Sequence, residues 1–245
     1  MPDIRVLSDA DAVVEAAARE LEAAARELEA LPSDAPFHLA LAGGSTPEVL
    51  YRRLAKVPSA WNRLHVWFGD ERCVAPDHPD SNFGMATRAW IGALPAERVH
   101  RMQGELAPEM AARAYEDELR AAFGDVVWPR FDVVLLGVGE DGHTASLFPG
   151  TAATHERARW VAANHVPKLD TWRITLTFPV LNAAQRIWIL AVGPRKAEIL
   201  RDVLGDVRDP ARWPVQAVQP TIGELVWWLD EAAAPGLDHA EPRTP

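Results

Sequence analysis

The sequence predicts a single α/β domain with three layers, α/β/α, in which a doubly wound, mainly parallel, Rossmann-like sheet lies between helices. Two observations support this prediction. Apolar runs typical of buried strands alternate with helical patterns along most of the chain, which is how βαβ units look in a sequence. In addition, no change of composition marks a linker between domains, and the 245 residues, 48% of them hydrophobic, are enough for one large core.

Taken in order, the first element is an alanine-rich amphipathic helix at residues 9–31. Its letters EAAAREL occur twice in succession, so a coiled coil is the alternative, but two heptads are too few to sustain one. Apolar runs follow at 37–44, 64–71, 131–139, 173–184 and 186–193, and helical patterns lie at 47–57, 81–94, 108–123 and 194–204. We assign residues 1–233 to the domain and the proline-containing residues 234–245 to a mobile tail.

Charge and cysteine content limit the partners and the compartment. The formal net charge is −10, so no overall positive field attracts nucleic acid or an acidic membrane, and the positive charge that an anion needs must be local. Cys73 is the single cysteine, which excludes an internal disulfide and fits a reducing compartment. We see no signal peptide, and no apolar run approaches the roughly 18 residues of a membrane span. We therefore expect a cytoplasmic protein without nucleic-acid or membrane partners.

Three of the predicted strands end in small or charged residues. These ends read AGGSTPE at 42–48, GDER at 69–72 and GVGEDGH at 137–143. In open α/β sheets the ligand crevice lies at the carboxyl ends of the strands, so the three segments are expected to meet there. The functional site is predicted at this edge of the sheet.

The third segment fits the glycine pattern G-x-G-x-x-G at residues 137–142, which raises the possibility of a dinucleotide site. Such a site needs a long helix after the glycines, and Pro149 leaves room for only one or two helical turns. It also needs an acid at the end of the next strand, whereas Glu156 precedes the apolar run at 160–163. The pattern therefore argues against a nucleotide cofactor.

His143 follows the carboxylates Glu140 and Asp141 on the same glycine-rich turn. An imidazole can take a proton from water near neutral pH when a neighbouring acceptor fixes its tautomer. A structural histidine is the alternative, but the position in the predicted crevice favours a catalytic role. Glu140 and Asp141 are the neighbouring acceptors on this turn.

The first segment offers an anion site. Glycine allows the backbone to approach a ligand closely at Gly44, Ser45 or Thr46 suits an N-cap, and Pro47 suits the first helical position. Free N–H groups at such a helix start bind phosphate well, although an ordinary capped turn is an equal alternative. No P-loop lysine follows, and Pro47 replaces the last glycine of a nucleophile elbow, so a Ser45 nucleophile is only a minor hypothesis.

Charged residues of other segments can complete the site. Asp70 and Glu71 offer carboxylates, and Arg72 offers a bidentate grip on phosphate or carboxylate, with a solvated charged loop as the alternative. Lys168, in a loop, and Arg173, at the start of the run 173–178, can supply the local positive charge, or can be surface charges.

Two other features are weaker candidates. Asp77, His78 and Asp80 suggest a metal site, but no second His or Cys lies at ligand spacing, so no metal is predicted. Cys73 follows an arginine that can lower a thiol pKa, but a small buried thiol is the commoner case.

The motifs together resemble the 6-phosphogluconolactonase family. The resemblance is carried in order by the letters LALAGGSTPEVLY, VWFGDERCVAPDHPDSNFGMA, FDVVLLGVGEDGHTASLFPG, PK followed by RITLTFPVLNAA, and WWLDEAAA, from about residue 37 to 233. It implies an α/β/α domain that hydrolyses 6-phosphoglucono-δ-lactone to 6-phosphogluconate, in the pentose phosphate pathway, without a metal or nucleotide cofactor. The implied partner is this phosphorylated sugar lactone, and we expect a monomer or a small homo-oligomer.

The resemblance also implies roles for individual residues. It makes His143 the general base, for which we predict Asp141 or Glu140 as the orienting group, and places Gly44, Ser45 and Thr46 on the substrate-binding loop. Arg72 of the DER motif falls on the family's ligand-binding arginine, and we also predict Asp70 as a substrate-binding residue. Lys168 and Arg173 match the family's downstream basic pair, although the letters KLDTWR depart from its proline-rich spacing.

Two other classes of protein compete with this interpretation. Glucosamine-6-phosphate deaminases are similar in the same segments but carry an acid in an FNEP-like segment after DGH, where this chain has SLFP at 146–149. A sugar-phosphate sensor that regulates transcription would need a DNA-binding module, and the first 36 residues show one helix and no helix-turn-helix. Both comparisons favour the lactonase.

Overall fold

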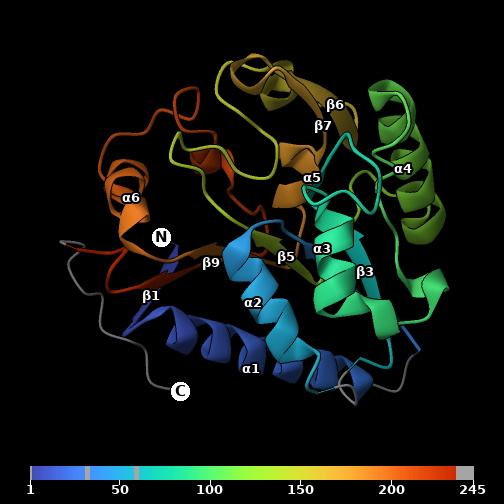
Figure 1. Cartoon of the computed structure of the whole chain (residues 1–245), viewed down its shortest axis with the longest axis horizontal. Helices are drawn as coiled ribbons and strands as arrows, with labels where there is room; N and C mark the ends of the chain where they lie inside the picture. Colours follow the sequence, from blue (N-terminus) through green and yellow to red (C-terminus); the bar gives the residue numbers. More distant parts are fainter. Residues whose placement is uncertain (1, 31–33, 58–60, 236–245) are drawn as a thin grey trace.

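Six strands form a parallel sheet at the centre of the molecule (Figure 1). The computed structural model describes residues 2–30, 34–57 and 61–235. The strand order is β1-β9-β8-β5-β2-β3, so β2 lies between β5 and β3. The strands are β1 (Asp3–Leu7), β2 (Phe37–Leu41), β3 (Leu64–Phe68), β5 (Val133–Leu136), β8 (Arg186–Ala191) and β9 (Glu224–Asp230).

Helices cover both faces of this sheet. They are α1 (Ala10–Glu29), α2 (Ser45–Leu54), α3 (Asn82–Ala89), α4 (Pro108–Phe123), α5 (Phe178–Asn182) and α6 (Ala197–Leu204). Alternate strand residues point to opposite faces: Leu39 and Leu41 pack in the core formed with α1, α2 and α3, whereas Ala40 packs in the core formed with α4, α5 and α6. Figure 1 shows α1 along the lower edge of the view with α2 against it. The three-layer α/β/α prediction is confirmed.

A second, antiparallel sheet joins the first at the site edge and was not predicted. Its strands are β4 (Asp70–Arg72), β6 (Val161–Val166) and β7 (Thr171–Leu176), in the order β4-β7-β6. The predicted single strand at 64–71 is therefore two strands, which separate at Gly69. The N–H of Gly69 donates to Leu41 of the parallel sheet, and its carbonyl accepts from Leu176 of the antiparallel sheet. β4 has only three residues and all of them are charged, so in the sequence they look like the polar end of β3 and not like a second strand.

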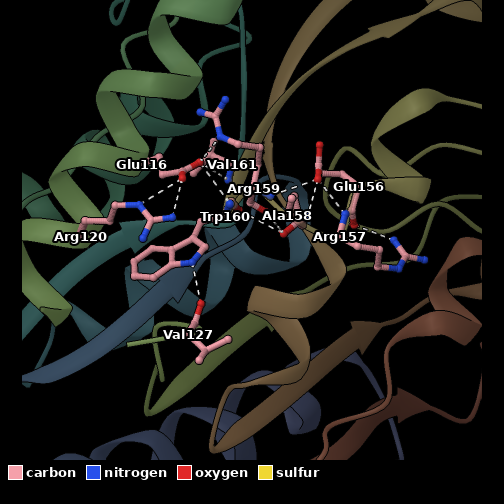
Figure 2. Close-up of polar contacts among 10 residues, drawn as sticks. Glu116, Arg120, Val127, Glu156, Arg157, Ala158, Arg159, Trp160 and Val161 are labelled. Atoms are coloured by element: carbon pink, nitrogen blue, oxygen red, sulfur yellow. Dashed lines mark hydrogen bonds and ion pairs between the residues drawn. The ribbon is translucent and has the colours of Figure 1, made fainter. Parts of the chain in front are cut away.

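A buried carboxylate attaches helix α4 to strand β6 of the second sheet. Glu116 is only 5% exposed and accepts hydrogen bonds from Arg120 at 2.8 Å, from Arg159 at 2.7 Å and from the backbone N–H of Trp160 (Figure 2). Next to it, Glu156 accepts from the three backbone N–H groups that follow it in the chain. The backbone N–H groups of residues 157–161, which lead into β6, thus donate to two carboxylates.

Most predicted elements agree with the structure to within a few residues. Helix α4 has the predicted bounds 108–123, and α1 begins after Asp9, whose side chain accepts from the N–H of Ala12. The buried face of α1 contacts the sheet and α2, which supports a single amphipathic helix instead of a coiled coil. The sequence reading missed β1 and did not recognise β9.

The chain ends and the helices bear on two further predictions. Ala233 and Ala234 are buried, and residues 236–245 of the predicted tail lie outside the described residues. Within residues 2–30, 34–57 and 61–235, no helix has the length and apolar character to cross a membrane.

Candidate active site

The three predicted strand ends do meet at one edge of the sheet. Asp70, of the GDER segment, accepts a hydrogen bond from the Ser146 hydroxyl, which follows the GVGEDGH segment, at 2.6 Å. Its backbone carbonyl accepts from the Asn82 amide at 2.9 Å, and the same amide group lies so close to Gly43 that a Cβ there would be 2.0 Å from its oxygen. Asp70 and Asn82 therefore bind the three segments together.

His143 and Asp141 form a pair at the centre of this region. Nδ1 of His143 is in a short hydrogen bond with Oδ1 of Asp141, and the ring of Phe148 stacks on the imidazole at 4.0 Å between centroids. The hydrogen bond from His143 holds the pKa of Asp141 well below its ordinary value, so this carboxylate is ionised at neutral pH. With Nδ1 engaged, Nε2 is the ring nitrogen that can accept a proton from a ligand or from water. Glu140, the alternative orienting group, is exposed.

The glycine pattern 137–142 has a local structural purpose. A Cβ at Gly139 would lie 2.1 Å from the His143 ring, so only glycine lets the imidazole fold over the backbone. Gly142 has φ +77°, a conformation that L side chains rarely adopt, and its N–H donates to the carbonyl of Gly139 at 2.9 Å. No helix forms between His143 and Pro149. The glycines thus shape the turn that presents His143 and do not begin a dinucleotide-binding helix.

Asp70 faces inward. It is 8% exposed, and its carboxylate accepts from Ser146 on Oδ2 and from Asn82 on Oδ1, at 2.6 and 3.3 Å. The neighbouring Glu71 is also buried and accepts from the Ser81 hydroxyl. The two carboxylates of the DER motif therefore organise the loop beneath the site.

Arg72 and Arg173 face each other across antiparallel strands β4 and β7, in direct register. Burial lowers the pKa of Arg173, and the positive charge of Arg72 lowers it further. One guanidinium N–H of Arg72 donates to the carbonyl of Asp80. Two like charges side by side, one of them half-buried, favour an anion between or beside them.

Lys168 contacts the His143–Asp141 pair from another loop. Its Nζ lies 3.4 Å from Oδ2 of Asp141, and its side chain is 72% exposed. The structure therefore brings together the predicted catalytic pair and one member of the predicted basic pair, Lys168. Arg173 lies instead beside Arg72 on the second sheet.

The segment 44–46 begins helix α2, but the predicted cap is wrong. Gly44 is the N-cap, with φ +107° and no side-chain capping hydrogen bond, and the helix already starts at Ser45. Ser45 and Thr46 thus occupy the first turn, and Pro47 is the third helical residue. The reason is the left-handed backbone of Gly44, which the sequence pattern does not reveal. The first-turn N–H groups have no partner within the helix and can still bind an anion.

Lys196 is a further candidate residue, which the sequence analysis did not single out. It precedes α6, and its Nζ donates to the carbonyl of Val138 at 2.8 Å, directly before the turn that carries His143. Burial lowers its pKa, and the nearby carboxylates of Glu140 and Asp141 oppose this effect. A signal was available, because residues 193–196 follow the carboxyl end of parallel strand β8, the same criterion that selected the other three segments.

The weaker candidates do not form sites. In the described part of the chain, no group of three or more His, Cys, Asp or Glu side chains is arranged to hold a metal ion, the residues 77–80 included. Burial raises the pKa of Cys73 to about 11, so this thiol stays protonated at neutral pH and is a poor nucleophile.

The chain is similar to known proteins over most of its length. Residues 8–227 match the family model described as Glucosamine-6-phosphate isomerases/6-phosphogluconolactonase. The 6-phosphogluconolactonase of Nostoc sp. is 42% identical over 206 residues, which are 82% of this chain and 85% of that protein. The human 6-phosphogluconolactonase is 42% identical over 209 residues, 82% and 80% of the two chains. The solved 6-phosphogluconolactonase from Trypanosoma cruzi covers 98% of both chains with a TM-score of 0.87 and 28% identity.

Proposed function

The chain belongs to the family of glucosamine-6-phosphate isomerases and 6-phosphogluconolactonases, as a 6-phosphogluconolactonase, and from this we propose how it works on its substrate. It hydrolyses 6-phospho-D-glucono-1,5-lactone to 6-phospho-D-gluconate, a step of the pentose phosphate pathway, with His143 assisting the attack of water. The observation that supports this mechanism most directly is the hydrogen-bonded pair of His143 and Asp141 at the edge where the strand ends meet.

The proposed reaction has two proton transfers at one nitrogen. Nε2 of His143 accepts a proton from water while the water oxygen forms a bond to the lactone carbonyl carbon, which gives a tetrahedral oxyanion. The bond from this carbon to the ring oxygen then breaks, the carbonyl re-forms as a carboxylic acid, and the proton on Nε2 passes to the departing ring oxygen. The acid then loses its proton to solvent. The ionised Asp141 stabilises the imidazolium between the two steps.

The phosphate of the substrate needs local positive charge in a chain of net charge −10. Four cations surround the His143–Asp141 pair or lie on the adjoining sheet: Arg72, Lys168, Arg173 and Lys196. The N–H groups of the first turn of α2, at Ser45 and Thr46, add the positive end of a helix dipole. We propose that these groups bind the phosphorylated end of the substrate and leave the carbonyl end at His143.

The deaminase reaction of the same family is disfavoured by the segment after the catalytic turn. Residues 146–149 contain no acid that could assist His143. The hydroxyl of Ser146 is committed to Asp70 at 2.6 Å and is buried. The deamination of an amino sugar phosphate would therefore lack, in this chain, the acid that assists the histidine.

The test is hydrolysis of freshly prepared 6-phosphogluconolactone, by rapid mixing to outpace its spontaneous opening, with proton release or coupled NADP reduction as the readout. We expect His143→Ala to lower kcat by about 10²- to 10⁴-fold, with a small change in KM. His155→Ala, which removes an exposed histidine elsewhere, is the matched control and is expected to behave as the wild type. Absence of acceleration by the wild type would reject the reaction, and an unchanged kcat in His143→Ala would reject the base.

Asp141→Asn tests the orienting group in the same assay. The amide keeps the shape of the side chain but removes the charge that holds the Nδ1 proton and stabilises the imidazolium. We expect kcat to fall by about 100-fold, within the range typical of acid–base contributions. Because Glu140 is exposed, Glu140→Gln is the control and is expected to retain kcat.

A further inference from the structure

The peptide group between Gly142 and His143 is held from both of its ends. Its carbonyl, on Gly142, accepts a hydrogen bond from the N–H of Val215 at 2.9 Å. Its N–H, on His143, donates to Oδ1 of Asp141 at 3.3 Å. Because a peptide group is planar, these two contacts set its orientation. That orientation in turn sets how the side chains of Asp141 and His143 lie relative to each other.

Trp213 supports the same peptide from behind. It is 7% exposed, and a Cβ added at Gly142 would lie 2.8 Å from its Cδ1 and 2.9 Å from its Cα. Gly142 is thus in contact with the tryptophan at a distance that only a glycine permits, and its φ of +77° also favours glycine. A cavity of about 420 Å³, lined in part by Asp141, Ile199 and Trp213, lies alongside. On this flank, Trp213 is packed directly against the turn.

The segment that carries Trp213 is itself anchored to two helices. We call residues 209–218 the brace. The side chain of Gln216 donates to the carbonyls of Val203, in α6, and Val207, at 3.0 and 2.9 Å, and accepts from the N–H of Asp209 at 2.7 Å. At the other end, the amide of Asn182, in α5, donates to the carbonyl of Ala217 at 3.0 Å. The brace can therefore resist displacement of the turn.

We propose that Trp213 is a positioning residue for the reaction, which holds the Gly142–His143 peptide so that Nε2 of His143 is aimed at the attacking water. The inference rests on the proposed role of His143 as general base. Trp213 acts through Gly142 and has no chemical step of its own. Loss of its support leaves substrate binding in place, because the cations of the site lie on other segments, but misplaces the base.

The experiment compares Trp213→Ala, Trp213→Phe and Trp61→Ala for kcat, KM and folded fraction. Trp61 is also a buried tryptophan and packs against Trp90. Its indole N–H donates a hydrogen bond to the carbonyl of Leu54, at the far end of α2. It serves as the control for loss of a large core side chain. We expect Trp213→Ala to lower kcat by about 10- to 100-fold with KM within a factor of two, since a small misplacement of a catalytic group costs this much. Trp213→Phe is expected to recover most of the kcat, and Trp61→Ala to keep it.

A second readout does not depend on turnover. In the substrate-free protein, the Nδ1 proton of His143 is held between the imidazole and Asp141, so its downfield proton resonance is expected in the wild type and in Trp61→Ala. It is expected to broaden or vanish in Trp213→Ala. If the wild type shows this resonance but does not hydrolyse the lactone, the proposed function fails while the positioning of His143 by Trp213 is still tested.

Two results would overturn the inference. One is a kcat and an Nδ1 resonance in Trp213→Ala that match those of Trp61→Ala. The other result concerns Gln216→Ala, which is used if Trp213→Ala does not fold. This substitution removes the hydrogen bonds that anchor the brace but removes no core side chain. Retention of wild-type kcat in folded Gln216→Ala, where we expect a loss of about threefold or more, would then reject the role of the brace.

Discussion

The hydroxyl of Ser146 donates a hydrogen bond of 2.6 Å to the buried carboxylate of Asp70, 76 residues away in the chain. Removal of this donor in Ser146→Ala leaves the charge on Asp70 with fewer partners, and an under-bonded buried carboxylate is costly. We expect the free energy of unfolding to fall by about 1–3 kcal/mol, measured by urea denaturation. Ser8→Ala removes a hydroxyl bonded to Asp9 on the surface and is expected to change stability by less than about 0.5 kcal/mol. Equal effects of the two variants would contradict the burial argument.

Arg173 is predicted to govern the binding of the phosphorylated substrate. Arg173→Ala removes the half-buried member of the cation pair with Arg72, and the hydrogen bonds of one charged group are worth about 1.5–3 kcal/mol. We expect KM to rise by about 10- to 100-fold with a smaller change in kcat, measured by steady-state lactone hydrolysis. Arg19→Ala, on the exposed side of α1, is the control. A wild-type KM in Arg173→Ala would remove this residue from the binding site.

His38 makes the fold sensitive to acid. Its Nδ1 accepts the indole N–H of Trp67 at 3.0 Å, and burial, with the nearby His65 and His100, lowers its pKa to about 4. An unfolded histidine titrates near 6.5, so between pH 6.5 and 4 the unfolded chain binds a proton that the folded protein does not. Stability is therefore retained above pH 6.5 and falls as the pH decreases towards 4, by about 3 kcal/mol from this group.

The corresponding measurement is urea denaturation at several pH values between 7 and 4. In His38→Gln, which keeps a hydrogen-bond acceptor but cannot titrate, the decline of stability with falling pH should be shallower than in the wild type. His155→Gln, at an exposed position, should leave the wild-type slope unchanged. Parallel slopes for the wild type and His38→Gln would show that His38 is not the group responsible.

Glu116 is predicted to stabilise the attachment of α4 to the second sheet (Figure 2). Burial alone would raise the pKa of its carboxyl, but the hydrogen bonds from Arg120 and Arg159 lower it below the ordinary value, so the group is charged at neutral pH. Glu116→Gln removes this charge, so the guanidinium groups of Arg120 and Arg159 lose the carboxylate with which they pair. The guanidinium groups are partly exposed, so we expect a loss of about 2 kcal/mol, less than for a fully buried pair.

Thermal or urea unfolding measures this loss, and Glu109→Gln on the exposed side of the same helix is the control, expected within about 0.5 kcal/mol of the wild type. The lactonase activity of the folded Glu116→Gln protein should match the wild type, because Glu116 has no contact with the His143–Asp141 pair. A loss of activity without a loss of stability would point to a different role.

The sequence was sufficient for the architecture and for the meeting of the three strand ends at one edge of the sheet. Alternation of apolar runs with helical patterns identified the parallel sheet, and the small or charged residues after three runs located the loops around His143. The antiparallel sheet was not predicted, because β4 is a strand of three charged residues, Asp70–Arg72, which in the sequence looks like the polar end of β3. The pattern of residues along a strand does not show which neighbouring strand each residue pairs with.

Side-chain direction was the other limit. The sequence placed Asp70 at the edge where the three strand ends meet but could not tell that its carboxylate turns inward to Ser146 and Asn82. It did not single out Lys196 either, although this residue follows the end of β8, and its hydrogen bond to the carbonyl of Val138 joins segments that are 58 residues apart in the chain. The glycine pattern at 137–142 likewise has two physical uses, close approach of a phosphate or of an imidazole, and only the three-dimensional arrangement distinguishes them.

The first strand of the chain pairs with the last. Within the described residues, β1 forms its ladder with β9, which follows the brace and ends at Asp230. During synthesis on a ribosome, β1 therefore emerges more than 200 residues before the strand that it pairs with, and the brace behind His143 emerges only shortly before β9. The nascent chain must therefore keep β1 unpaired while more than 200 further residues are made, and the turn that carries His143 lacks the brace for most of that time.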